Sequence, residues 1–347
     1  MGSLIPFMLP PLIVSFLLSF LLTPYCKRLA VSLKILDVPS ERKVHRTPIP
    51  LLGGVALYIG FVLTAISHLP MDQTLLTILG GGTLIFILGL VDDVWGVSAI
   101  YKLIAQVFIA SLTCYFGIVI QFVTNPVQEG FIYLGWGASF LTILWIVGVT
   151  NIFNLIDGLD GLSAGVSAIS AFFLAFFAMQ TGQVMAAILA VILLGLCLGF
   201  LRYNFAPAKI FMGDSGAMLL GYLLSIISIL GFLKSTIVIS LGVPLLIFAL
   251  PMSDMIFAII RRLKNKRSIY LPDKEHVHHK LLEKGLSPKQ VALRLYTFSF
   301  CLGVIALFIN SVDLQVVLIT GFVVVCVFLV VKRKQQLSFT RFFQFFL

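Results

Sequence analysis

The chain has 347 residues, of which 60% are hydrophobic and only 11% are charged. A soluble domain carries about a quarter charged residues, so this composition excludes an ordinary soluble globular protein. The formal net charge is +10, but the basic residues lie between apolar segments instead of forming a nucleic-acid patch, and we expect no nucleic-acid partner.

Apolar runs in chain order predict membrane-spanning helices, because each is long enough to cross a hydrocarbon core about 30 Å thick. The runs lie near 4–24, 50–68, 74–91, 101–122, 137–153, 160–180, 184–201, 215–232, 235–259, 292–310 and 314–331. We therefore predict an all-α, polytopic integral membrane protein with about 11 transmembrane helices, folded as a single domain over residues 1–347.

The distribution of basic residues predicts the orientation of these helices. Only Lys234, among the 24 basic residues, lies on the side opposite connections 25–49, 92–100, 154–159, 202–214 and 260–291. By the positive-inside rule, these connections and the C-terminus are cytoplasmic and the N-terminus is outside. The basic cluster from Arg261 to Arg267 is explained most simply as an anchor to lipid headgroups.

The first polar block is the adjacent pair Asp92 and Asp93, followed by Lys102 on the next span. Acidic residues at the edge of an apolar span are costly, which makes them functional candidates. Two adjacent carboxylates also repel each other unless a cation or a shared proton offsets the repulsion. The functional interpretation is a pair beside a metal or a general base. The alternative is that Asp92 caps a helix and Asp93 is solvated.

The second block spaces Asn151, Asn154, Asp157 and Asp160 by three residues at the end of an apolar run. If this stretch is helical, the spacing places the four side chains along roughly one face. Two glycines in the block allow a sharp turn or a close approach to a ligand. Helix capping alone would explain one aspartate but not all four polar residues.

The third block combines the cation Lys209 and the amide Asn204 with Phe211 and Asp214 in a glycine-flanked stretch. A helix N-terminus with nearby cations suits an anionic phosphate, and an aspartate suits a divalent ion that bridges it. Oxygen ligands without cysteine favour Mg²⁺ or Mn²⁺ over zinc.

The fourth block places His276, His278 and His279 within four residues. A phosphate contact or a proton carrier fits a connection this basic. A zinc site and a merely solvated cluster are the two alternatives.

Together the four blocks resemble the polyprenyl-phosphate N-acetylhexosamine-1-phosphate transferases. The motifs that carry the resemblance are Asn154-Leu-Ile-Asp157-Gly-Leu-Asp160-Gly-Leu and Phe211-Met-Gly-Asp214-Ser-Gly, in this order. The resemblance runs from Asp37 to the histidine block, and it departs at Leu51-Leu52, where many members have a basic residue. It implies transfer of an N-acetylhexosamine 1-phosphate from a UDP-sugar to polyprenyl phosphate, with release of UMP.

The resemblance also implies a role for each polar residue. Asp214 with Asn154 would hold Mg²⁺, for which Mn²⁺ can substitute, across the donor diphosphate. Asp92 or Asp93 would deprotonate or orient the lipid phosphate beside Lys102, and His279 would join them in catalysis. The expected substrate-binding residues are Asn151, Asp157, Asp160, Asn204, Lys209, Phe211, His276 and His278.

The His-x-His-His form resembles the branch of the family that uses UDP-GlcNAc to initiate O-antigen, enterobacterial common antigen or wall teichoic acid. The expected location is the bacterial cytoplasmic membrane, with the active site on the cytoplasmic face. Expected partners are the UDP-sugar, undecaprenyl or another polyprenyl phosphate, and membrane lipids, and a homodimer is left open. The alternatives are a phospho-MurNAc-pentapeptide transferase and an ion-coupled transporter.

Overall fold

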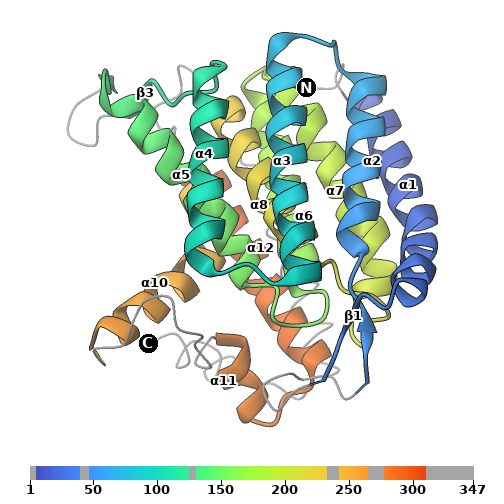
Figure 1. The fold of residues 1–347 in the computed structure, drawn as a ribbon. Coiled ribbons are helices and arrows are strands. Elements are labelled where there is room, and N and C mark those ends of the chain that lie inside the picture. Colours follow the sequence, from blue (N-terminus) through green and yellow to red (C-terminus); the bar gives the residue numbers. More distant parts are fainter. Residues whose placement is uncertain (1–4, 40–46, 125–129, 233–241, 265–276, 310–347) are drawn as a thin grey trace.

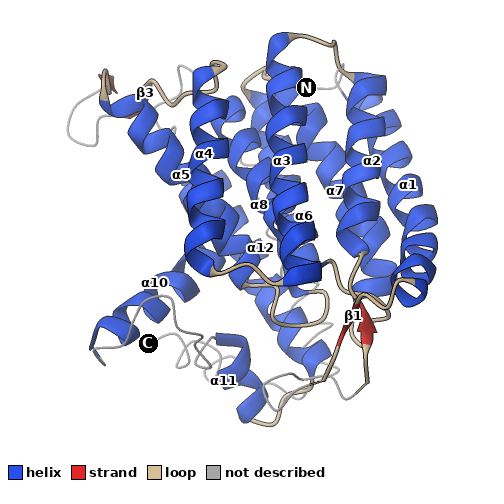
Figure 2. Cartoon of the chain, viewed as in Figure 1, coloured by secondary structure: helices blue, strands red, loops and turns tan. Residues whose placement is uncertain are grey.

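A computed structural model describes residues 5–39, 47–124, 130–232, 242–264 and 277–309, and it is almost entirely helical (Figures 1 and 2). Seven helices in this part of the chain are long and apolar enough to cross a membrane. They are α1 (Ile5–Ser32), α3 (Gln73–Trp95), α5 (Gly137–Leu155), α6 (Leu162–Gln180), α7 (Val184–Asn204), α8 (Gly213–Phe232) and α12 (Pro288–Ile309). Two shorter apolar helices, α2 (Gly53–His68) and α4 (Ala99–Tyr115), complete the bundle. The predicted polytopic all-α fold is confirmed.

Helices α1 to α8 run alternately up and down, so that four helix ends and four helix starts meet at one end of the bundle (Figure 1). Backbone hydrogen bonds join these segments. Gly53 N and Gly54 N donate to Phe211 O and Met212 O at 2.9 and 2.8 Å, which ties the start of α2 to the start of α8. This end, where α3 finishes and α8 begins, is called the acidic pole below.

Helix α8 forms the centre of the bundle, because 89% of its most apolar window is buried inside the protein. It packs against α3 and α5 in particular. Glycines permit the close approach: a Cβ added at Gly89 of α3 would collide with the backbone of Ser215, and one at Gly81 would collide with the Tyr222 hydroxyl. Small residues bring helices together in this way where lipid supplies no hydrophobic force between them.

The predicted span 235–259 is wrong as one continuous helix. Its described part consists of α9 (Gly242–Ile247) and α10 (Ala249–Lys264), and α10 runs away from the bundle in Figure 1. Pro251 has no N–H for the Ile247 carbonyl and its ring crowds that carbonyl, which explains the break. Exposed Phe257 and Leu263 and the three basic residues in its last turn make α10 amphipathic, as in helices that lie on a membrane surface.

Other boundaries also differ from the predictions. The helix predicted to reach residue 122 ends at Tyr115, because Gly117 adopts a φ of +103°. The chain then forms β3 (Phe122–Thr124), which pairs antiparallel with β4 (Phe131–Tyr133). A second antiparallel pair joins β1 (Leu36–Asp37) to β2 (Ile49–Pro50). The predicted last span, 314–331, lies outside the described residues.

Candidate active site

Lys102 is the centre of a charged group formed by three helix ends at the acidic pole. Its Nζ lies 2.7 Å from Asp92 Oδ2 in the last turn of α3 and 3.0 Å from Asp214 Oδ2 in the first turn of α8. The α3–α4 turn is closed by Val97 N, which donates to Asp92 Oδ1 at 2.6 Å, and by Gly96 with a φ of +70°. Residues separated by more than a hundred positions thus hold one ammonium between two carboxylates.

Asp93 points toward the start of α8 instead of solvent. Its two carboxylate oxygens accept hydrogen bonds from Asp214 N at 2.7 Å and Ser215 N at 3.1 Å. A carboxylate at this position satisfies two unpaired N–H groups and interacts favourably with the helix dipole. The alternative that Asp92 caps a helix and Asp93 is solvated is wrong: Asp92 lies in the last turn of α3, and Asp93 caps α8 from another helix.

The Asp157–Gly161 loop joins α5 to α6, so the predicted helical face ends at Leu155 and does not reach Asp157 or Asp160. Asp160 Oδ2 accepts a hydrogen bond from Ala208 N at 2.8 Å, which ties this loop to the connection between α7 and α8. The Tyr296 hydroxyl of α12 donates to Gly161 O at 2.5 Å. The loop is therefore fixed from both sides of the acidic pole.

Asp157 is half-buried, and none of the described residues donates a hydrogen bond to its carboxylate. Burial raises the pKa of Asp157 well above its ordinary value, and the negative charges of Asp214, Asp93 and Asp160 raise it further. A carboxyl group in this position is ionised most favourably when a cation accompanies it.

Two predicted substrate-binding amides have partners within the protein. Asn151 Nδ2 donates to Gln106 Oε1 at 2.6 Å and to Val147 O at 2.8 Å, so it links α5 to α4. Asn204 is 2% exposed, and its Nδ2 donates to Ile210 O at 3.0 Å, which shapes the connection before α8. Their contact with substrate stays a prediction. Asn154, the predicted metal ligand, lies half-buried in the last turn of α5.

The histidine block begins helix α11 (Val277–Glu283), which approaches the Asp157–Gly161 loop. His278 is buried, and a Cβ added at Gly158 would come within 2.8 Å of its Nε2. The rings of His278 and His279 lie with centroids 4.3 Å apart. The histidines and the second acidic block, more than a hundred residues apart, therefore share one site. His276 lies outside the described residues.

Asp254 of α10 has a role in the site that the sequence motifs do not predict. It is 6% exposed, and its Oδ1 accepts a hydrogen bond from Val277 N at 3.0 Å, at the start of α11. Asp254 therefore positions the histidine helix. Its occurrence inside an apolar segment was the signal that could have identified it, because such an acid is expensive without a partner.

The remaining predicted residues lie in the connection between α7 and α8. Phe211 is half-buried, and its N–H donates to Pro50 O at 2.9 Å. Lys209 is exposed and lines a hollow with Lys27 and Arg28 of α1. The structure thus brings Asp92, Asp93, Lys102 and Asp214 into one group, and it places Lys209 beside a different set of cations.

The acidic pole offers oxygen ligands suited to Mg²⁺. Within the described ranges, no three or more His, Cys, Asp and Glu side chains form a ready-made metal site. Mg²⁺, however, is commonly held by one or two carboxylates together with water and substrate phosphates. Asp214 already shares a cation, Lys102, with Asp92, and none of the basic residues that the structure describes pairs with the nearby carboxyl of Asp157. The donor set therefore fits a divalent ion that arrives with a diphosphate.

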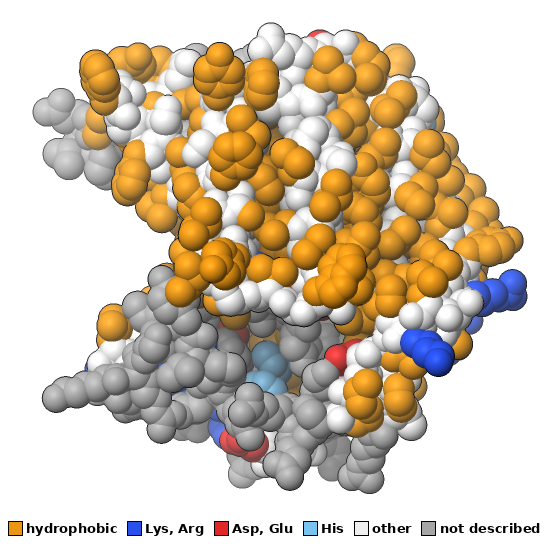
Figure 3. All heavy atoms as spheres, in the orientation of Figure 1, with side chains coloured by type: hydrophobic (Ala, Val, Ile, Leu, Met, Phe, Trp, Pro, Cys, Tyr) orange, Lys and Arg blue, Asp and Glu red, His pale blue; other side chains and the backbone are white. Residues whose placement is uncertain are grey.

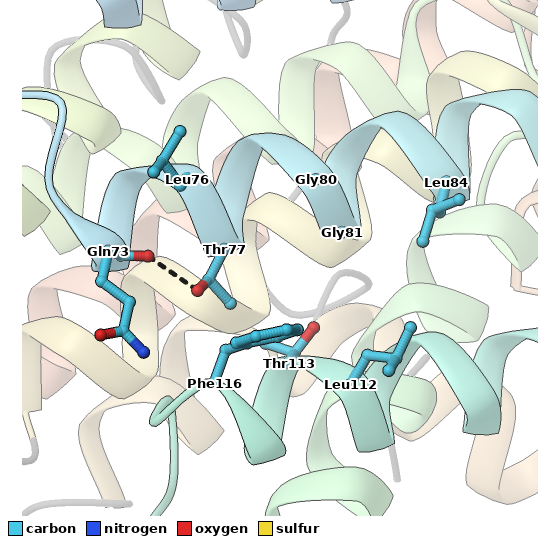
Figure 4. Close-up of a pocket in the computed structure, with 9 residues that line it drawn as sticks. All are labelled: Gln73, Leu76, Thr77, Gly80, Gly81, Leu84, Leu112, Thr113 and Phe116. Atoms are coloured by element: carbon cyan, nitrogen blue, oxygen red, sulfur yellow. Dashed lines mark hydrogen bonds between the residues drawn. The ribbon is translucent and has the colours of Figure 1, made fainter.

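The opposite half of the bundle contains a hollow of a different kind. A hollow of about 310 Å³ opens there between α3 and α4 (Figure 4). Its lining includes Leu84, Leu112 and Phe116, and it has no ionisable residue. Figure 3 likewise shows hydrophobic side chains over the face of the bundle, with acidic and histidine side chains gathered at the acidic pole. Polar chemistry is thus concentrated at one end.

Comparisons with known proteins identify relatives of this chain. The model of the family described as glycosyl transferase family 4 matches residues 75–232, which contain Asp92 through Asp214. The chain is 39% identical to the probable undecaprenyl-phosphate N-acetylglucosaminyl 1-phosphate transferase of Bacillus subtilis, over 90% of this chain and 88% of that protein.

Two further relatives cover most of the chain. The decaprenyl-phosphate N-acetylglucosaminephosphotransferase of Mycobacterium tuberculosis is 34% identical, over 89% of this chain and 84% of its own length. The phospho-N-acetylmuramoyl-pentapeptide-transferase of Bacillus velezensis is 31% identical, over 86% and 95%.

Proposed function

This chain belongs to glycosyl transferase family 4, and we propose that it transfers GlcNAc 1-phosphate from UDP-GlcNAc to polyprenyl phosphate, with release of UMP. The observation that carries the proposal is the convergence of Asp92, Lys102 and Asp214 from three helices on one point at the end of a membrane bundle. A phosphate at the headgroup level can reach that point from the bilayer, and a water-soluble nucleotide can reach it from solution.

The acceptor side of the reaction is assigned to α3 and α4. Lys102 is the cation placed to bind the phosphate of the lipid. Asp92, whose Oδ2 contacts Lys102, is placed to orient that phosphate or to take its remaining proton. Asp93 is engaged by two backbone N–H groups of α8, so its role is to position Asp214. Catalysis of phosphoryl transfer rests mainly on such positioning and on charge stabilisation.

The donor side is assigned to the Asp157–Gly161 loop and to α11. Asp160 ties this loop to the connection before α8, His278 lies close to Gly158, and His279 lies beside His278. These groups are placed to contact the sugar and the diphosphate, and Phe211 is the aromatic available to stack on uracil. His279 is the candidate to interact with the phosphate that moves.

Mg²⁺ is the metal that the acidic pole would accept, with Asp214 and Asn154 as its protein ligands. When bound, it would offset negative charge on the donor diphosphate and on the departing UMP. The support is the hard-oxygen donor set and the carboxyl of Asp157, which has no partner among the described residues.

The proposed location is the bacterial cytoplasmic membrane, with the acidic pole on the cytoplasmic face. Basic residues gather on that side of the chain. In a cysteine-free background, an impermeant thiol reagent added to intact cells should label a cysteine at position 129 but not one at 278. Labelling at 278 alone would reverse the proposed orientation.

Two other functions remain to be separated by experiment. The 31% identity to a phospho-N-acetylmuramoyl-pentapeptide-transferase supports a different donor on the same scaffold. A carrier is disfavoured because it would place ionisable residues near mid-span, whereas Asp92, Asp93 and Asp214 lie at helix ends and Asp157 and Asp160 lie in the connection between α5 and α6.

The decisive experiment measures UMP released by purified protein from a panel of UDP-sugars that includes UDP-GlcNAc and UDP-MurNAc-pentapeptide. UMP should appear only when UDP-GlcNAc, polyprenyl phosphate and Mg²⁺ are all present. EDTA should stop the release, and Mg²⁺ or Mn²⁺ should restore it. If only UDP-MurNAc-pentapeptide gives UMP, the proposed donor is wrong. Full turnover after EDTA treatment would rule out the requirement for a metal.

A further inference from the structure

A second hollow at the acidic pole is lined by cations. It has a volume of about 450 Å³ and lies between the C-terminal part of α1 and the chain that leaves α7. Its lining residues are Thr23, Pro24, Lys27, Arg28, Val31, Tyr203, Lys209 and Ile210. This hollow, called the α1–α7 pocket, combines positive charge with apolar surface.

The three cations of the α1–α7 pocket have no carboxylate partner among the residues that the structure describes. Lys27 and Arg28 come from α1, and Lys209 comes from a segment about 180 positions later in the chain. Among the described residues, no carboxylate forms an ion pair with any of them. Like charges that are brought together from distant segments repel, and an anion between them would remove that repulsion.

The position of the pocket indicates which kind of anion it binds. Tyr25 and Leu29, on the same two turns of α1, are 66% and 47% exposed, and exposed apolar residues continue along α1. The Arg28 guanidinium lies 5.9 Å from the centre of the Tyr25 ring. Tyrosine beside basic residues is typical of the boundary between hydrocarbon and headgroups. The pocket therefore lies at the headgroup level, next to a surface that acyl chains would cover.

The pocket is connected to the catalytic segment but separate from its charged group. Lys209 and Ile210 precede Phe211 and Met212, whose carbonyls accept hydrogen bonds from the start of α2. Two residues further, Asp214 faces Lys102. An anion held by Lys209 would thus steady the connection that leads into the catalytic helix without touching the reacting groups.

We propose that the α1–α7 pocket binds the phosphodiester of an anionic membrane phospholipid and that this lipid stabilises the connection between α7 and α8. Cationic pockets between transmembrane helices bind such headgroups, and each Lys or Arg near the surface adds to the attraction. This site is distinct from the proposed acceptor site at Lys102, and its binding does not depend on the transfer reaction.

The test is thermal unfolding and native mass spectrometry of the purified full chain in a neutral detergent. The probes are phosphatidylglycerol, phosphatidylcholine, polyprenyl phosphate, inorganic phosphate and UMP. Phosphatidylglycerol should raise the unfolding temperature of the wild type and remain bound as a discrete adduct, and phosphatidylcholine should do neither. The variant Lys27→Gln/Arg28→Gln should weaken the apparent affinity for phosphatidylglycerol by roughly twentyfold.

The matched control is Lys34→Gln/Arg202→Gln, which removes two exposed charges from the same pole but lines no part of the pocket. It should keep the phosphatidylglycerol effect. If Lys27→Gln/Arg28→Gln does not fold, Lys209→Gln replaces it, with an expected loss of several-fold, because Lys209 is exposed.

An unchanged affinity in the pocket variants, or an equal loss in the control, would overturn the proposal. Protection by inorganic phosphate or UMP that disappears in the pocket variants would assign the pocket to a soluble phosphate. Protection by polyprenyl phosphate but not by phosphatidylglycerol would assign it to the acceptor. Either result would likewise refute a phospholipid site.

Discussion

The two halves of the candidate site differ in how their carboxylates are satisfied. In the group around Lys102, Asp92 and Asp214 share one ammonium, and Asp93 accepts two backbone N–H groups. In the Asp157–Gly161 loop, Asp160 accepts one N–H, whereas none of the described residues donates to Asp157. Within the described part of the chain, every carboxylate of the first half thus has a partner, whereas Asp157 in the second half has none.

This difference indicates a division of labour. A pre-formed charged group costs little to reorganise during the reaction, so it suits the stabilisation of charge in the transition state. A carboxylate without a partner instead gains from the arrival of a cation or a hydrogen-bond donor, so it suits binding of the metal and the donor. Variants in the first half should therefore lower turnover, and variants in the second half should lower affinity.

The largest effect is expected at Asp214, which belongs to the first half and is also the proposed metal ligand. Asp214→Asn removes a charge that contacts Lys102 and is the proposed metal ligand. Turnover should fall on the order of a hundredfold or more, in line with the loss of one pre-organised group that stabilises the transition state. Steady-state UMP release at saturating Mg²⁺ gives the measurement. A variant with more than half of the wild-type rate would exclude Asp214 from the chemistry.

A smaller loss of turnover, about tenfold, is expected for Asp93→Asn, since the amide can replace only one of two accepted hydrogen bonds at the start of α8. Affinity for UDP-GlcNAc, measured by calorimetry, should stay within a few-fold of the wild type.

The control is Asp72→Asn at the other end of α3, where Asp72 caps the helix by accepting from Leu75 N at 2.8 Å. Because the amide oxygen of asparagine keeps this single hydrogen bond, the variant should lose little stability and no turnover. Equal loss of turnover in both variants would mean that Asp93 acts only through folding.

Asp160→Asn tests the second half of the comparison. The amide oxygen can still accept from Ala208 N, so the variant removes charge while it keeps the loop contact. Affinity for UDP-GlcNAc should fall about tenfold, because a charge-assisted contact becomes a neutral one. Calorimetric titration compares it with Asp93→Asn. The assignment of the two halves would be reversed if Asp93→Asn abolished binding and Asp160→Asn left it intact.

Gly158→Ala should give a loss of affinity of a few-fold, because the new Cβ would come within 2.8 Å of His278 Nε2 and displace the ring. Gly148→Ala on α5 is the matched control, since a Cβ there would have no neighbour within 4 Å. Binding and turnover are measured for both. If the two variants bind and turn over equally, the contact between α11 and the Asp157–Gly161 loop does not contribute to donor binding.

The smallest effect concerns stability without substrate. The raised pKa of Asp157 means that its ionised form is unfavourable in the folded protein, so ionisation destabilises the fold as pH rises above the ordinary pKa of an aspartate. Asp157→Asn should therefore unfold about 1–3 °C higher than the wild type at pH 7, and this gain should vanish near pH 4. Added Mg²⁺ should also reduce the difference in unfolding temperature between this variant and the wild type. If Asp157→Asn unfolds at a lower temperature than the wild type at pH 7, the predicted direction of the change is wrong.

The order of apolar and acidic residues along the chain is enough to predict the class of the fold and most members of the site. A run of about 20 apolar residues can satisfy its backbone in lipid only as a helix, so composition alone predicts a polytopic bundle. Acids are equally informative, because their cost in an apolar environment limits them to positions where they serve a purpose. The motifs around Asp157 and Asp214 identified the family before any contact was known.

The pairing of those residues, by contrast, depends on how the helices pack against one another. The sequence left Asp92 and Asp93 equivalent, but the close contact at Gly89 brings the start of α8 to Asp93 and leaves Asp92 to Lys102. It also missed the break before Pro251, by which α10 departs from the bundle and Asp254 comes to hold the histidine helix. Such pairings depend on which helices are neighbours in the bundle. The neighbours are set by close packing at small residues far apart in the chain, and the local periodicity of one helix carries no information about them.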